Sequence, residues 1–390
     1  MEQNQSFYTL QFWLLCASSV LFMASFNMIV PELNAFIETL GGGGYKGAII
    51  YLFAFAALLA RPFSGQLADQ MGRIPVMIIG PLVCVILGIL YPWATTVWGF
   101  LILRFFHGFS TGFKPTGTSA YLGDIVPANK RGEAMGILGV AGGIGMAGGP
   151  LIGGWLSKAV SLDAVFYASS GVAMLSILVL AGMKESLPKT KTAMESLRGI
   201  RFENLIDLSA LRPSIIMFLL IFAFGVVLTT TSDFCDHLGI ENRGMYLGIT
   251  LFASIISRLF SGKWSDRWGR KKVLLIGTSI LTIGIIVTGL STTVNQFYIG
   301  AFIYGVSAGI NSPTIFAWTI DLANDQNRGK AMATMFIALE SGIIAGSQQG
   351  YFWYNNQPDR LPIPYFLAAV LTIIAFGLLV KWIRNPIKKS

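Results

Sequence analysis

The chain has 390 residues, of which 54% are hydrophobic and only 12% are charged. Soluble domains carry roughly 25% charged residues, so this composition excludes an ordinary soluble enzyme or binding module and indicates an integral membrane protein. The formal net charge of +9 could suggest a nucleic-acid partner, but the basic residues follow membrane topology, and nucleic-acid binding is not predicted.

Long apolar runs occupy most of the chain. A helix of roughly 18 or more apolar residues can cross about 30 Å of hydrocarbon. Barrel strands would instead alternate in segments of about ten residues, so the fold class is all-α integral membrane. We predict twelve transmembrane helices at residues 8–30, 47–68, 75–93, 97–122, 133–157, 163–183, 213–236, 244–265, 272–292, 295–320, 330–353 and 362–384.

Basic residues are distributed unequally between the predicted loops. With the N-terminus placed inside, the outer loops hold only Lys46, Lys158, Arg243 and Arg360. Cytoplasmic loops carry an excess of Lys and Arg, so both termini are predicted to be cytoplasmic in a multi-pass protein of the cell (inner) membrane. The first run lacks a basic leader and a cleavage site, which predicts a retained helix rather than a signal peptide.

Residues 184–212 form the longest polar segment and are predicted to be a cytoplasmic linker between two six-helix bundles, at 1–183 and 213–390. Five apolar residues recur in it at nearly helical spacing, namely Leu197, Ile200, Leu205, Leu208 and Leu211. The segment is therefore either partly an amphipathic helix on the inner leaflet or a solvated tether.

A sequence repeat supports the two-bundle division. Residues 61–73 read RPFSGQLADQMGR and residues 258–270 read RLFSGKWSDRWGR, with an offset of 258 − 61 = 197. The same offset relates Asp124 to Asp321 and Arg131 to Arg328. Both copies fall on the predicted cytoplasmic side, which indicates parallel repeats and hence two pseudo-symmetric bundles.

At these residues the chain resembles the major facilitator superfamily, and in particular its twelve-helix bacterial drug/proton antiporters. The resemblance rests on the signature Gly-x-Leu-Ala-Asp-x-x-Gly-Arg at residues 65–73 and on its second copy. It implies a cytoplasmic gate that would include Gly65, Asp69, Gly72, Arg73, Asp124, Arg131, Gly262, Asp266, Gly269, Arg270, Asp321 and Arg328. The alternative is that these residues only staple the loops and set topology.

The fifth predicted helix carries a second motif. Its residues Gly145, Gly149, Pro150, Gly153 and Gly154 resemble the Gly-x-x-x-Gly-Pro-x-x-Gly-Gly motif that marks exporters of the family. We expect this run of small residues to pack closely against a helix of the other half, with a bend at the proline.

Ionisable and polar side chains inside the runs are the candidates for proton coupling and the substrate cavity. A charge within the bilayer must be paired or face water, so it indicates a functional site. Glu340, deep in the eleventh helix, is the first candidate, for coupling or for holding a cationic substrate. The alternative is a structural ion pair with Lys114 or Arg104. The full set is Glu340, Arg104, Lys114, Asn27, Glu32, Phe109 and Asn311.

We therefore predict a secondary active transporter that exports a small organic, amphipathic solute by proton antiport and alternating access, and that functions as a monomer in the lipid bilayer. Alternatives are a proton-coupled importer of a sugar, organic anion or nutrient, a transporter of lipids or lipid-linked molecules, and a membrane receptor or enzyme that has lost transport. Cys16, Cys84 and Cys235 fall in apolar runs, and neither a metal site, a cofactor nor a catalytic residue is predicted.

Overall fold

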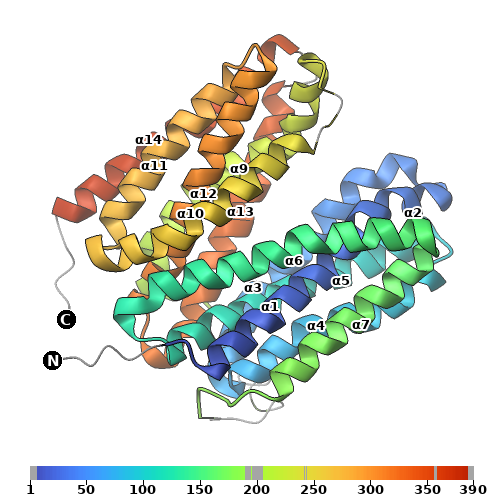
Figure 1. The fold of residues 1–390 in the computed structure, drawn as a ribbon, viewed down its shortest axis with the longest axis horizontal. Coiled ribbons are helices and arrows are strands. Elements are labelled where there is room, and N and C mark those ends of the chain that lie inside the picture. The colour runs from blue at the N-terminus through green and yellow to red at the C-terminus, as the bar shows by residue number, and fades with distance from the viewer. Residues whose placement is uncertain are drawn as a thin grey trace. The chain divides into compact units, whose positions relative to one another are not determined.

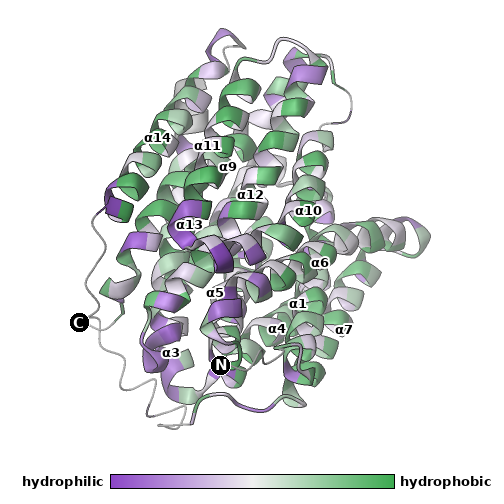
Figure 2. Ribbon diagram, turned by 60° about the vertical axis from the view of Figure 1, so that its left-hand side comes forward, coloured by the Kyte–Doolittle hydropathy of each residue, from purple (hydrophilic) through white to green (hydrophobic). Residues whose placement is uncertain are grey.

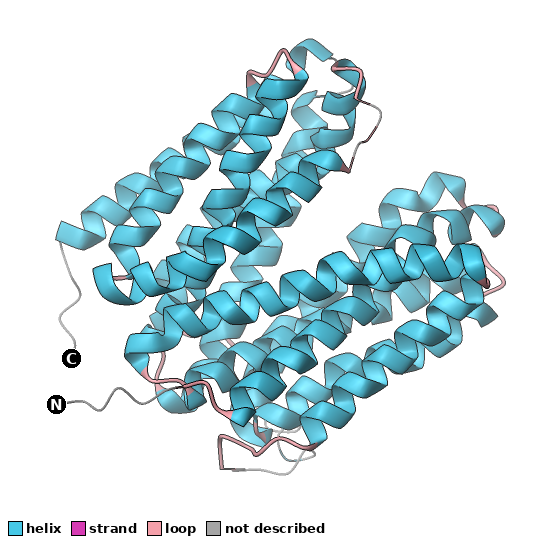
Figure 3. Cartoon of the chain, viewed as in Figure 1, coloured by secondary structure: helices cyan, strands magenta, loops and turns pink. Residues whose placement is uncertain are grey.

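The computed structural model describes residues 7–188, 195, 205–240, 242, 244–354 and 358–384. Within these ranges the chain is helical and contains no strand (Figure 3). The long helices, labelled in Figure 1, are α1 (Leu10–Ile29), α3 (Lys46–Met71), α4 (Arg73–Leu90), α5 (Val97–Ile125), α6 (Arg131–Ala159), α7 (Leu162–Ala181), α9 (Leu211–His237), α10 (Met245–Trp268), α11 (Arg270–Gly289), α12 (Val294–Leu322), α13 (Arg328–Tyr354) and α14 (Pro362–Arg384).

The predicted fold class is confirmed: twelve long helices are present among the described residues. Nine candidate spans are long and apolar enough to cross a membrane, and apolar colouring runs along their helices in Figure 2. The other three long helices are α5, α12 and α13. These carry the polar candidates Arg104 and Lys114, Asn311 and Glu340 respectively, and such residues lower the mean hydropathy of a span.

The first predicted helix, 8–30, corresponds closely to α1, but the chain that follows it is also helical, which was not predicted. Pro31 lies in a 3-10 turn, Val30–Glu32, that follows α1, and the chain then continues as the short helix α2 (Leu33–Thr39). Proline supplies no backbone N–H and therefore interrupts the helix. Leu33, Phe36 and Ile37 are buried on one side of α2, and their helical spacing explains why this segment packs inward.

The helices divide into two compact units. Unit 1 comprises Met1–Pro127, Ile137–Leu208 and Ala323–Phe336, and unit 2 comprises Ala128–Gly136, Ser209–Leu322 and Ile337–Ser390. The first residues of α13 therefore belong to unit 1, and the first residues of α6 belong to unit 2. The predicted boundaries at 183 and 213 stay a prediction. Leu197 and Ile200, on which the amphipathic linker helix partly rested, lie outside the described residues.

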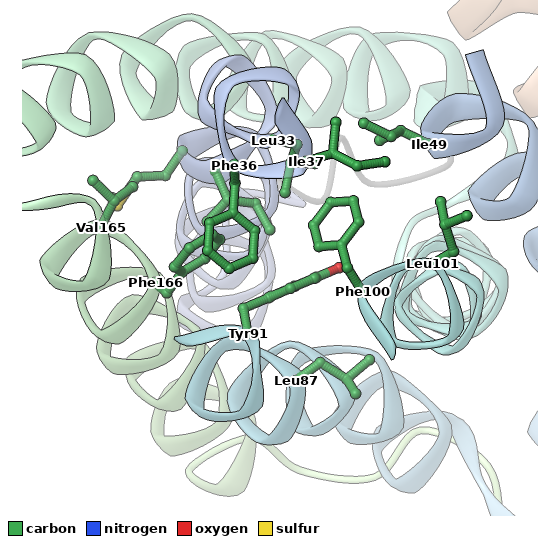
Figure 4. Packing of buried hydrophobic residues seen from close by; sticks show 12 residues of the cluster. Leu33, Phe36, Ile37, Ile49, Leu87, Tyr91, Phe100, Leu101, Val165 and Phe166 are labelled. Carbon is green, nitrogen blue, oxygen red and sulfur yellow. The ribbon is translucent and has the colours of Figure 1, made fainter. Parts of the chain in front are cut away.

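An aromatic cluster holds unit 1 together at the ends of α4 and α5 that lie away from the repeated motif (Figure 4). The rings of Tyr91 and Phe166 stack with centroids 5.0 Å apart, and Phe36 packs edge-on against Phe166 at 5.3 Å. Because each ring buries a large apolar area, this cluster holds α2, α4 and α7 against one another at the end of unit 1 that lies away from the repeated motif.

Candidate functional site

The repeated motif forms a sharp turn between two helices in each unit. Gly72 separates α3 from α4 with φ of 102°, and Gly269 separates α10 from α11 with φ of 88°. Only glycine adopts this backbone region without strain. Each turn places an aspartate at the end of one helix close to an arginine at the start of the next, namely Asp69 with Arg73 and Asp266 with Arg270.

Cluster 1, defined as Asp69, Arg73, Asp124 and Arg328, is a buried network of two acids and two bases in unit 1. Arg73 is paired with Asp69, and its Nε donates to Asp124 Oδ2 at 2.9 Å. Arg328 Nη1 donates to the other oxygen of Asp124 at 2.7 Å. The side chain of Arg73 has an exposed fraction of 0%. A charge at this depth is tolerable only while it is paired, so loss of one partner costs several kcal/mol.

Asp69 also binds the beginning of α13. Its Oδ1 accepts from the backbone N–H of Gly329, and its Oδ2 accepts from that of Lys330, each at 2.8 Å. These N–H groups have no partner within the helix, and a carboxylate there also interacts favourably with the helix dipole. Gly65 permits this approach, because a Cβ at that position would meet Ala333 and the backbone of Gly329.

Cluster 2, defined as Asp266, Arg270, Asp321 and Arg131, repeats this arrangement in unit 2. Arg270 is paired with Asp266, and its Nε donates to Asp321 Oδ2 at 2.8 Å. Arg131 Nη1 donates to Asp321 Oδ1 at 3.0 Å. Asp266 accepts from the first N–H groups of α6, at Gly132 (2.9 Å) and at the following residue (2.8 Å).

Every residue of cluster 1 thus has its equivalent in cluster 2 at the offset of 197, including the helix N-terminus that each aspartate caps. Charges beside the clusters differ. Lys330, next to cluster 1, corresponds to Glu133, next to cluster 2 (330 − 133 = 197). Asp325, which pairs with Arg328 at 2.7 Å, corresponds to Ala128 (325 − 128 = 197). Glu133 is paired with Lys130 and Lys263, both at 3.4 Å. The predicted gate residues are therefore brought together in two groups, whereas their role as a gate stays a prediction.

Sequence reasoning missed Glu185, which stabilises the start of α4. Its carboxylate accepts from the backbone N–H of Arg73 at 2.8 Å and of Ile74 at 3.0 Å. The next residue, Ser186, donates from Oγ to Asp124 Oδ2 at 2.7 Å. The signal in the sequence was weak, because Glu185 is one acid in a polar segment and the helix that it caps begins 112 residues earlier (185 − 73 = 112).

Replacing Gly72 by Ala is expected to destabilise the protein by about 1 to 3 kcal/mol, because alanine is strained at this φ. The new Cβ would also meet the carboxylate of Glu185 and displace the cap on α4. Gly269→Ala is the matched control, since its backbone is equally strained but nothing lies within 4 Å of the added carbon. Thermal unfolding of the purified protein in detergent should show the larger loss for Gly72→Ala; an equal loss would contradict a role of the cap.

The glycines of the fifth predicted helix pack within unit 1, and not against the other half as expected. Gly145, Gly149 and Gly153 lie on one face of α6, and a Cβ on any of them would collide with the backbone of α1. The equivalent Gly342 and Gly346 of α13 lie against the backbone of α9. Residues spaced four apart lie on one face of a helix, and α1 of the same half packs against this glycine face. Gly154 has no atom within 4 Å of a built Cβ, and Pro150 lies inside α6.

Lys114 and Asn311 occupy equivalent buried positions (311 − 114 = 197). Lys114 is 1% exposed, donates from Nζ to Thr118 Oγ1 at 3.2 Å and packs against Gly80. Asn311 is 5% exposed and packs against Gly277. Both side chains thus point towards the interior of their own unit, between adjacent helices.

Arg104 is also buried in unit 1. Its Nε donates to the carbonyl oxygen of Ile49 at 3.2 Å, and its guanidinium lies 4.2 Å from the centre of the Phe53 ring. The nearby His107, which sequence reasoning did not select, lies 3.1 Å from the hydroxyl of Tyr91 through Nδ1. Arg104 is therefore packed on an aromatic face and a backbone carbonyl in this structure.

The remaining candidates are dispersed. Asn27 donates to the carbonyl of Met23 in its own helix at 2.8 Å, and Glu32 accepts from Ser157 Oγ at 2.9 Å. Phe109 packs against aromatic rings one turn earlier on α5. Glu340 is half-buried on the part of α13 that belongs to unit 2. None of these four belongs to either cluster.

Comparisons with known proteins identify the family. The Major Facilitator Superfamily profile matches residues 15–254 and 214–390. The chain is 28% identical over 374 residues to the multidrug resistance protein MdtG of Escherichia fergusonii, covering 92% of this chain and 90% of the relative. It is also 28% identical over 348 residues to the protein of that name from Serratia proteamaculans, covering 84% and 83%.

Solved structures show the same fold. The human organic anion transporter MFSD10 (TETRAN) matches with a TM-score of 0.81 at 17% identity, covering 95% of this chain and 98% of that chain. The proton:xylose symporter XylE matches with a TM-score of 0.80 at 15% identity, covering 95% of both chains. The duplicated clusters, the twelve long helices and the family profile agree, and the chain belongs to the Major Facilitator Superfamily of multi-pass membrane transporters of small molecules.

Proposed function

We propose that this transporter exports small amphipathic organic solutes by exchange for protons, with alternating access. The observation that carries the proposal is the pair of equivalent clusters, in which a buried aspartate binds the N-terminus of a helix far away in the sequence. The direction of transport is supported by the relatives, which are multidrug resistance proteins matched over most of their length, and by the exporter motif of α6.

Clusters 1 and 2 would act as latches on one side of the membrane. Each latch consists of charge-assisted hydrogen bonds that can break and reform without covalent change. Two separate latches of this kind suit a protein that must close one entrance firmly and then release it in every cycle. The distribution of basic residues supports placing both latches and both chain termini in the cytoplasm, with the protein in the inner membrane.

We further propose that one chain is the functional unit.

Transport into inside-out vesicles tests the direction. The probe is an undecanoic acid that carries a dansyl fluorophore, together with its uncharged methyl ester and the corresponding trimethylammonium compound. An acid vesicle interior should drive accumulation of at least one of these probes, and an ionophore that dissipates the proton gradient should abolish it. Vesicles without the transporter are the control. Accumulation only in right-side-out vesicles would reverse the proposed direction.

A further inference from the structure

Arg258 is a charged residue in the middle of a membrane helix. It lies 13 residues after the start of α10 (258 − 245) and 10 before its end (268 − 258), which corresponds to about 20 Å and about 15 Å along the helix. Its Nε donates to Ser254 Oγ at 3.2 Å. In the part of the chain that the structure describes, no carboxylate is paired with Arg258 and its two terminal nitrogens make no hydrogen bond.

The side chain lies on the polar side of its helix. Ser254 and Ser261, one turn to either side, are buried, whereas Phe252, Ile256 and Phe260 expose apolar side chains on a different face of α10. Arg258 is half-buried. An ionisable residue within a membrane span is costly unless it is paired or faces an aqueous cavity, so an unpaired guanidinium here is a candidate functional residue.

The repeat provides an internal comparison. Arg61 is the equivalent residue of the first half, and it is 3% exposed. Its Nη1 lies 3.3 Å from Thr116 Oγ1, and its guanidinium stacks at 4.1 Å on the ring of Phe336. The Arg61 position is thus occupied by interactions within unit 1.

The second half lacks these partners. Thr116 corresponds to Pro313 (313 − 116 = 197), which has no hydroxyl group, and Phe336 corresponds to Gly139 (336 − 139 = 197), which has no ring. Arg61 therefore has a structural role in unit 1, whereas its equivalent in unit 2, Arg258, lacks those interactions. This asymmetry within an otherwise repeated motif points to binding of something that the chain itself does not supply.

We propose that Arg258 binds the carboxylate of an amphipathic organic anion, which makes such anions a preferred substrate class. With Nε held by Ser254, the two terminal nitrogens remain for two carboxylate oxygens, and this planar pairing is the one that arginine forms best. The proposal rests on the transport function proposed above.

Binding of the three dansyl probes to the purified full-length transporter in lipid nanodiscs tests this assignment. The wild type should bind the carboxylate about tenfold or more tightly than the methyl ester. Arg258→Gln should abolish that difference while the affinity for the ester stays within about twofold. Arg258→Lys should keep part of the preference, because it retains the charge but loses the planar pair. Arg267→Gln removes one positive charge near the end of the same helix and should leave the preference unchanged.

Three outcomes would overturn the proposal. The first is a wild type without preference for the carboxylate, and the second is an equal effect of Arg258→Gln on all three probes. The third is loss of the preference in Arg267→Gln, which would indicate a general charge effect. Transport assays in inside-out vesicles distinguish failure of the anion site from failure of the proposed export function. If the wild type accumulates the ester or the cation in inside-out vesicles but binds no carboxylate, export stands and the anion site fails.

Discussion

Replacing Asp69 by Asn is expected to reduce the maximal rate of transport by at least about tenfold while leaving substrate affinity close to that of the wild type. Asn keeps the size of the side chain but loses the charge that pairs with Arg73 and binds two N–H groups of α13. Breaking a buried ion pair costs about 3 to 5 kcal/mol, and a tenfold rate change requires only about 1.4 kcal/mol. The latched state should therefore be populated too rarely to sustain the cycle.

The repeat offers the matched comparison for this variant. Asp266→Asn removes the equivalent carboxylate from cluster 2 and should slow transport to a similar degree. Asp163→Asn changes an exposed acid in the first turn of α7 and should have little effect. Initial rates over a range of probe concentrations in proteoliposomes separate maximal rate from affinity. A loss of affinity alone for Asp69→Asn would place Asp69 in the substrate site and contradict the latch.

Much of the fold follows from the sequence because hydrophobicity and the repeat act at the level of whole helices. Apolar runs longer than a bilayer crossing can form only spanning helices. The turn glycines, Gly72 and Gly269, and the paired charges beside them were likewise apparent from their duplicated spacing. The acids and arginines of the two clusters recur at the same offset, and in both copies they make the same contacts.

What the sequence could not provide is the choice of neighbour. The glycine face of α6 is a stripe that any close helix could use, and only the structure shows that α1 occupies it. Glu185 caps a helix that begins more than a hundred residues earlier, and no local pattern encodes such a contact. Lys114 and Asn311 were selected for polarity alone, which does not distinguish a cavity wall from the space between two packed helices.

Replacing Glu340 by Gln is expected to abolish proton-driven accumulation while substrate exchange across the membrane persists. Among the described helices Glu340 is the acid that lies well inside a long helix, 12 residues after the start of α13 (340 − 328), whereas the other acids lie near helix ends. Gln has almost the same shape but cannot bind or release a proton. If Glu340 carries the coupled proton, the variant should equilibrate its substrate and no longer concentrate it.

Two assays on the same proteoliposomes resolve this expectation. Accumulation driven by an imposed pH gradient measures the coupling of transport to protons. Exchange of dansyl probe for unlabelled probe at equal pH measures movement of the substrate across the membrane without that coupling. Asp163→Asn is the control, because this acid is exposed in the first turn of α7 and belongs to neither candidate set. It should retain both activities. Full gradient-driven accumulation by Glu340→Gln would remove Glu340 from the coupling mechanism, whereas loss of both activities would assign it to substrate binding or to a structural ion pair.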